Sequence, residues 1–163
     1  MAQTLTVPEM LPANFMPNMK NRFIFAIEGI DAFMIKTAAR PEITTEEVVL
    51  NWLNSTRYVA GKTTFNPISV TLYDPISPSG AQQVMEWSRL KFEPVSGRSG
   101  YPDFYKRDIQ LKMVDPVGTV VQLWDIKGAW CTSENFGDLS MDDGAAAAEI
   151  SLTIRFDIAV LQY

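Results

Sequence analysis

The stretch EISLTIRFDI at Glu149–Ile158 alternates strictly between apolar and polar residues, and it constrains the fold more than any other segment of the chain. Successive side chains of a β-strand point to opposite faces of a sheet, so this period predicts a strand with one buried and one wet face. The apolar side chains are Ile150, Leu152, Ile154, Phe156 and Ile158. The polar side chains are Ser151, Thr153, Arg155 and Asp157. The buried set predicts a core, whereas the wet set requires a functional explanation.

Other segments also have strand patterns. Ile68–Asp74 and Arg107–Met113 alternate in the same way, with Asp108 and Gln110 among the polar positions of the second. RFIFAIEG, from Arg22, is apolar at both alternate positions, which predicts a strand covered on both sides. After a turn at Gly29–Asp31, we expect Ala32–Ala39 to return beside it as a hairpin partner.

Only one segment has a strong helical period. Within residues 77–92, Ala81, Val84, Trp87 and Leu90 recur at helical spacing, and Ser77 with Pro78 is a suitable start. The sequence therefore predicts a mainly β fold. We expect two packed antiparallel sheets, as a sandwich or partly closed barrel, with one flanking α-helix.

The length of 163 residues favours one domain with extensions. Residues 1–20 contain three of the ten prolines and no clear period, so we expect an irregular N-terminal arm before a β domain at 21–163. Between Ile43 and Pro67 the chain makes a long Thr/Asn-rich excursion containing Trp52 and Tyr58. Excursions of this length are uncommon in compact domains unless they are functional.

The composition argues against most catalytic chemistry. The chain has no histidine and one cysteine, Cys131, which removes the commonest general base, the commonest metal ligand and any internal disulfide. Cys131 is best explained as a small core residue. We expect neither cofactor nor bound metal, and no enzyme activity; a hydrolase that uses acidic residues alone is the weakest alternative.

Two short motifs resemble ligand loops without their full pattern. Gly97–Gly100 has the spacing of a GxxG clamp but lacks the helix that must follow, so a plain turn explains it better. Asp138, Ser140, Asp142 and Glu149 match four positions of a calcium loop, but Asp143 occupies the position that requires glycine. A solvated acidic loop is the better interpretation.

The net charge of −5 argues against a protein that grips nucleic acid, because such affinity comes largely from Lys and Arg. A protein that nucleic acid merely passes remains compatible with it. No apolar run approaches the roughly 20 residues of a membrane span, so no membrane anchor is expected.

The order of these segments resembles a known family. It runs from NRFIFAIEGI through ARPEI, the long excursion, FNPISVTLYDP, a helix with MEW and YKRDIQLKMVDPVG, and it ends with VVQLWDIKGAWCTSENFGDLSMDDGAAAAEISLTIRFD. This resembles the tail tube proteins of contractile-tailed bacteriophages, which are related to the inner tubes of type VI secretion systems and pyocins. The similarity covers about Arg22–Asp157, and its most specific part is Trp124–Asp157.

The resemblance implies a structural virion protein that is made in the host cytoplasm. Copies would form hexameric rings whose inner sheets join into one barrel, and rings would stack into the tail tube through which DNA leaves. The implied partners are other copies, the contractile sheath protein, a tape-measure protein in the bore, and baseplate and tail-terminator proteins. A β-sandwich ligand-binding module that uses Trp52, Tyr58 and the 132–148 loop is the alternative.

The resemblance also suggests roles for particular residues. The long hairpin at residues 44–65 would reach the next ring, through Glu46, Glu47, Asn51, Trp52, Asn54 and Tyr58. The bore would be lined by the wet face of EISLTIRFDI (Ser151, Thr153, Arg155 and Asp157), or by a partner strand that contains Asp108 and Gln110. A net acidic, hydroxyl-lined bore would let DNA slide.

Overall fold

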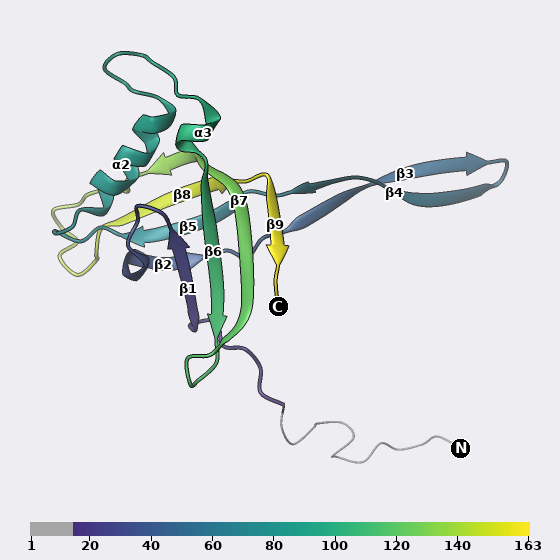
Figure 1. Ribbon diagram of the computed structural model, residues 1–163, viewed down its shortest axis with the longest axis horizontal. Helices are drawn as coiled ribbons and strands as arrows, with labels where there is room; N and C mark the ends of the chain where they lie inside the picture. Colours follow the sequence, from purple (N-terminus) through teal and green to yellow (C-terminus); the bar gives the residue numbers. More distant parts are fainter. Residues whose placement is uncertain (1–14) are drawn as a thin grey trace.

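One long strand, β7 (Val120–Asn135), takes part in two sheets, and the rest of the fold is arranged around it (Figure 1). The computed structural model describes residues 15–163. The first part of β7 pairs with β6 and β9, and the part from Trp130 onward pairs with β8. Gly128, at φ +66°, lies where the strand passes from one sheet to the other. A Cβ at this position would overlap the carboxylate of Asp157, so the crossing requires glycine.

The first sheet, sheet A, is antiparallel and has the order β1–β6–β7–β9. Its other strands are β1 (Phe23–Ile27), β6 (Arg107–Val114) and β9 (Ile158–Leu161). The second sheet, sheet B, has the order β2–β5–β8–β7. Its other strands are β2 (Ile35–Ala38), β5 (Ile68–Tyr73) and β8 (Glu149–Arg155).

The core lies between the inner faces of the two sheets, whose strands run in clearly different directions (Figure 1). Alternate apolar residues of β5, β6 and β8 are almost completely buried, as their sequence period predicts. The largest fully buried side chains include Trp87, Phe25, Met34, Ile68, Leu72, Ile109, Ile126, Ile150, Leu152 and Ile154. The predicted fold class, two packed antiparallel sheets in a mainly β chain, is confirmed.

The expected hairpin between Arg22 and Ala39 is wrong. A turn and a 3₁₀ helix, η1 (Ala32–Met34), do follow β1, but β2 pairs with β5, and β1 pairs with β6. The two strands therefore belong to different sheets. The expectation that β1 is covered on both sides also fails in the single chain, because Ile24 on its outer face is 46% exposed.

The helix α2 (Gly80–Lys91) flanks the sandwich and lies within the expected range 77–92. Its N-cap is Ser79 instead of Ser77, because the Ser79 hydroxyl accepts a hydrogen bond from the Gln82 amide at 3.4 Å. Pro78 therefore precedes the helix. A short helix, α3 (Pro102–Tyr105), packs beside it, and the Trp87 indole N–H donates to the Tyr105 carbonyl at 2.8 Å.

The long excursion is a two-stranded antiparallel hairpin that projects away from the body of the molecule (Figure 1). It consists of β3 (Ile43–Trp52) and β4 (Ser55–Phe65). Of the N-terminal arm expected at residues 1–20, residues 1–14 lie outside the described part, and residues 15–19 have no regular secondary structure. No helix within residues 15–163 is long and apolar enough to cross a bilayer.

We expect Gly128→Ala to destabilise the protein by at least about 1 kcal/mol, because non-glycine residues lose roughly 1–2 kcal/mol in a left-handed conformation. The overlap with Asp157 adds to this cost. Urea unfolding followed by circular dichroism measures the loss. The matched control is Gly144→Ala, where a Cβ meets nothing within 4 Å and the stability should stay within about 0.5 kcal/mol. Equal effects at both glycines would contradict a special role for the crossing.

Candidate assembly surfaces

The hairpin formed by β3 and β4 is the largest exposed element of the chain. Every residue of β3 is exposed, and most of β4 is exposed as well. At its tip, the side chains of Trp52 and Leu53 are 76% and 91% exposed. An isolated two-stranded hairpin is at best marginally stable in water, so this element fits a partner surface better than free solvent.

The six contact residues expected on the hairpin are all exposed, but they do not share one face. Cross-strand pairing places Val49 opposite Tyr58 and Asn51 opposite Thr56, on the same face as Glu47. Trp52 lies on the other face. A register shift between Thr45 and Glu47 leaves Glu46 outside the regular pairing, and Asn54 lies in the turn.

The Trp52 face is more apolar than the sequence pattern indicated. It also contains Val48, Leu50 and Val59, each between 43% and 50% exposed. Sequence reasoning missed these three. The run EEVVLNW contains Val48 and Leu50 at alternate positions, whereas Val59 joins them from β4 through its pairing with Val48. We call Val48, Leu50, Trp52 and Val59 the apolar hairpin face.

The outer face of sheet B is lined by uncharged polar side chains. The strand register aligns them in two rows across β2, β5, β8 and β7. The first row consists of Thr37, Thr71, Ser151 and Asn135, and the second of Ser69, Thr153 and Ser133. We call these seven residues the hydroxyl-rich face. The charged groups beside it are the Lys36–Glu149 ion pair and Arg155, and the hydrogen bond to Glu149 raises the pKa of Lys36.

The structure separates the residues expected to line a bore. Ser151 and Thr153 lie on the hydroxyl-rich face, with Arg155 at its edge. Asp157 follows β8, and its carboxylate forms an ion pair with the Lys106 ammonium at 2.7 Å.

Asp108 and Gln110 lie on β6, which pairs with β1 and β7, so β6 is not a pairing partner of EISLTIRFDI. Their expected place in a bore stays a prediction. Both belong to the outer face of sheet A, where Gln110 donates to Asp125 at 3.2 Å. Five further members of the hydroxyl-rich face were not among the expected residues: Thr37, Ser69, Thr71, Ser133 and Asn135. The alternation in ISVTLYD contains the signal for two of them.

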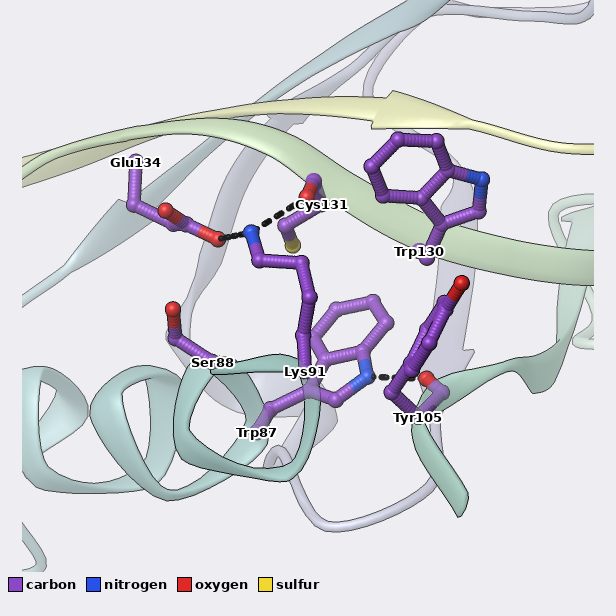
Figure 2. Close-up of a pocket in the computed structure, with 7 residues that line it drawn as sticks. All are labelled: Trp87, Ser88, Lys91, Tyr105, Trp130, Cys131 and Glu134. Atoms are coloured by element: carbon purple, nitrogen blue, oxygen red, sulfur yellow. Dashed lines mark hydrogen bonds and ion pairs between the residues drawn. The ribbon is translucent and has the colours of Figure 1, made fainter. Parts of the chain in front are cut away.

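The contact between α2 and sheet B is a structural junction with no room for a ligand (Figure 2). Its cavity measures about 10 Å³, enough for about one water molecule. The Lys91 ammonium donates to the Cys131 carbonyl at 2.8 Å and to Glu134 at 3.0 Å. Trp130 and Tyr105 stack edge to face with ring centroids 6.1 Å apart.

Cys131 is 5% exposed in this junction, as expected for a core residue. Burial raises the pKa of its thiol to about 12. Within residues 15–163, no three His, Cys, Asp or Glu side chains gather in a way that could hold a metal ion.

Comparison with known proteins identifies relatives of this chain. No family model matches the sequence. The tail tube protein of Serratia phage KSP90 is 26% identical over 100 residues, which are 61% of this chain and 55% of that protein. This chain thus matches about half the length of its curated relative.

Solved structures share the fold over nearly the whole chain. A chain in the sheath/tube terminator of the extracellular contractile injection system PVC, in the extended state, superposes with a TM-score of 0.75. It is 16% identical and covers 93% of this chain and 100% of its own length. A chain in the PVC sheath–tube complex has a TM-score of 0.71 and 14% identity, covering 98% and 99%. The resemblance to the tail tube family is therefore confirmed. The likeness to the solved structures shows the fold.

The buried thiol predicts a pH dependence of stability. Because the pKa of Cys131 is about 12 when folded and near 9 when exposed, only the unfolded chain releases the proton between these values. The contribution of this thiol to stability is thus fully present below about pH 9. It is lost as the pH rises toward 12, by about 1.4 kcal/mol per pH unit.

Urea unfolding between pH 8 and 11 measures this loss. In Cys131→Ala, the free energy of unfolding should fall less steeply with pH over this range. Parallel slopes for the two proteins would contradict the assignment to this thiol.

Proposed function

We propose that this chain is the subunit of an inner tail tube, in which the β domain at residues 21–163 forms hexameric rings that stack. DNA would pass through the tube into the host when a sheath contracts. The sequence relative that is named a tail tube protein and the fold shared with a sheath–tube complex support this proposal. The single observation that carries it is the combination, on one small domain, of a projecting apolar hairpin and a polar, uncharged sheet face.

Ring closure would use the open edges of sheet B. In the single chain this sheet ends at β2 on one side and at the second part of β7 on the other. Exposed strand edges promote uncontrolled pairing, and a closed ring of sheets removes them. One edge of each copy would pair with the opposite edge of the next, which is a head-to-tail contact that closes into a ring.

The hydroxyl-rich face would then line the bore. DNA carries one charge per ~1.7 Å, so a bore dense in Lys or Arg would hold it through many contacts. The two rows of hydroxyl and amide side chains offer no such cations. The charges beside them are Lys36, Glu149 and Arg155, or +1 in total (two positive and one negative). The face is thus nearly neutral instead of acidic. DNA would slide along it because few cations are present to hold the phosphates.

The hairpin would make the contact between rings. Its apolar face, with Val48, Leu50, Trp52 and Val59, requires a partner to bury it. Stable obligate interfaces usually bury about 2,000 Å² or more, to which a projecting hairpin contributes on both faces. Glu47, Asn51 and Tyr58, on the opposite face, would contact a second neighbour.

The proposed partners are other copies, a contractile sheath protein, a baseplate and a tail-terminator protein, with a tape-measure protein in the bore during assembly. The location would be the tail of a virion. A catalytic role has no support in the residues: the chain lacks histidine, and its single thiol is buried with a raised pKa. The alternative, a ligand-binding module, has less support because Trp52 and Tyr58 lie on opposite faces of the hairpin.

Electron microscopy of the concentrated protein tests the proposal, with hollow rods as the expected result. Trp52→Ser combined with Leu53→Ser should reduce the rods to single rings or monomers, because the tip then loses its apolar contact. The matched control is Val117→Ser, which removes an equally exposed side chain from the turn between β6 and β7 and should leave rods of normal length. Small particles from the unchanged protein under all buffers would favour the ligand-binding alternative.

Lysine substitutions test which sheet faces the bore. We expect rods of Ser69→Lys with Thr153→Lys to retain short DNA that survives nuclease treatment at low salt and is released at high salt. Gln110→Lys with Asp125→Lys, on the outer face of sheet A, should give no such protection. Protected DNA in the second variant and not in the first would assign the bore to sheet A.

A further inference from the structure

An open depression lies on the apolar hairpin face, close to the tip of the hairpin. It measures about 380 Å³, within the roughly 300–1,000 Å³ range of ligand pockets. Its lining residues are Leu50, Trp52, Ser55 and Arg57. These four form two directly opposite cross-strand pairs, two positions apart, so their side chains share one side of the hairpin. We call this depression the tip groove.

The tip groove combines an apolar wall with a single cation. Trp52 and Leu50 form the wall, and their side chains are 76% and 50% exposed. Arg57 is the only charged residue from Val48 to Gly61. It forms no ion pair within residues 15–163. Because a guanidinium binds a carboxylate through two parallel hydrogen bonds, a fitting occupant presents apolar side chains beside a carboxylate.

One loop of the chain has this composition. The acidic loop, residues 136–148 between β7 and β8, contains three aspartates and neither lysine nor arginine. Two large apolar side chains stand among these aspartates: Leu139 is 89% exposed, and Met141 is completely exposed. No aspartate of the loop forms an ion pair within residues 15–163. The loop therefore presents, on a short stretch, the groups that the tip groove lacks.

The tip groove and the acidic loop lie at opposite ends of the molecule (Figure 1). The register of β5 with β8 separates them by the length of sheet B. Ile68, just after the base of the hairpin, pairs with Ile154, whereas Tyr73 pairs with Glu149 at the end of the acidic loop. The two surfaces therefore cannot meet within one chain. A contact between opposite ends of two copies is head-to-tail, and it repeats along the line of copies instead of stopping at a dimer.

A second hairpin tip fits the tip groove less well. A tip-to-tip contact would bring two Arg57 side chains toward one another, and like charges repel. The segment from Val48 to Gly61 contains no carboxylate that could offset this repulsion. Charge complementarity therefore favours the acidic loop as the occupant.

We propose that the acidic loop of one copy binds in the tip groove of a second copy. Met141 packs on Trp52, because a methionine sulfur makes favourable contacts with an aromatic ring. The carboxylates of Asp142 and Asp143 face the Arg57 guanidinium. This inference rests on the proposed stacking of rings, and it names the surface of the next ring that receives the hairpin.

Charge reversal tests the ion pair. Arg57→Glu should reduce the amount of sedimenting rods at least several-fold, because the groove then presents a negative charge to an acidic loop. Asp142→Arg combined with Asp143→Arg should cause a similar loss. The chain that carries all three substitutions should recover rods, since both signs are then exchanged. No loss in the first two variants, or no recovery in the third, would contradict the pairing.

The matched control for charge reversal is Arg98→Glu, which changes an exposed arginine in the loop after α2. It should leave the amount of rods unchanged. Combined with Asp142→Arg and Asp143→Arg, it should not restore rods, because position 98 lies outside the tip groove. Recovery through Arg98→Glu would show that net charge, and not this contact, controls assembly.

A cross-link tests the contact whether or not rods form. Chains with Ser55→Cys are mixed at high concentration with chains that carry Ser140→Cys, under mild oxidation by oxidised glutathione. A disulfide forms only when the two Cα atoms lie within about 7 Å. Cys131 does not compete, because it is 5% exposed and burial raises the pKa of its thiol to about 12. Mass spectrometry should identify a link between positions 55 and 140, and exposed Ser96→Cys in place of Ser140→Cys should give none.

The outcomes separate this contact from the tube function. Where rods form, the link and the charge rescue together support the proposal, and the absence of either overturns it while the proposed tube stands. Where no rods form, the link alone supports the head-to-tail contact and counts against the tube, and its absence overturns both. A link between two copies of Ser55→Cys, in place of the mixed link, assigns the groove to a second tip and overturns the proposal.

Discussion

The crossing of β7 from one sheet to the other is the constraint on which this fold depends. A single strand that pairs first with β6 and β9 and then with β8 fixes the relative position of the two sheets through the covalent chain. The crossing needs a left-handed residue that lets the Asp157 carboxylate approach closely, and Gly128 meets both conditions. Lys106 holds that carboxylate at 2.7 Å, which connects the end of β8 to the start of β6. The two inner faces consequently enclose one core, and their outer faces remain available for separate contacts.

Alternation in the sequence predicted most of the strands because each has one buried and one exposed face. The inner residues of β5, β6 and β8 are buried as their period indicates. Strand pairing was harder to predict, since period two shows which residues share a face but gives no information about neighbours. This explains the error at β2, which follows β1 closely in sequence and nevertheless pairs with β5. It also explains why Asp108 and Ser151 were considered for one surface, although they lie on different sheets.

The assembly surfaces were predictable to different degrees. The hairpin was visible as a long excursion with exposed aromatic residues, but the division of Trp52 and Tyr58 between its two faces depends on cross-strand register. The hydroxyl-rich face was only half visible. Ser151 and Thr153 follow from one strand. Ser69 and Thr71 join them through the pairing of β5 with β8, whose segments lie about 80 residues apart in sequence. Ser133 joins them through the pairing of β7 with β8, across the acidic loop. A surface built across strands cannot be read from any one of them.

The acidity of the chain as a whole says little about that surface. The net charge of −5 includes the acidic loop around Asp138, Asp142 and Asp143, which follows β7 and lies outside the two polar rows. Beside the hydroxyl-rich face, Lys36 forms an ion pair with Glu149, and Arg155 is the one remaining cation among the described neighbours of the face. Such a face would retain a polyanion only weakly, because its cations lie too far apart to contact many phosphates at once. The affinity from counterion release increases with the number of phosphates contacted. If the face were repeated around a ring, each copy would add one isolated arginine, and the cations would form no continuous track. The local arrangement of charge on this face therefore matters more than the net charge of the chain.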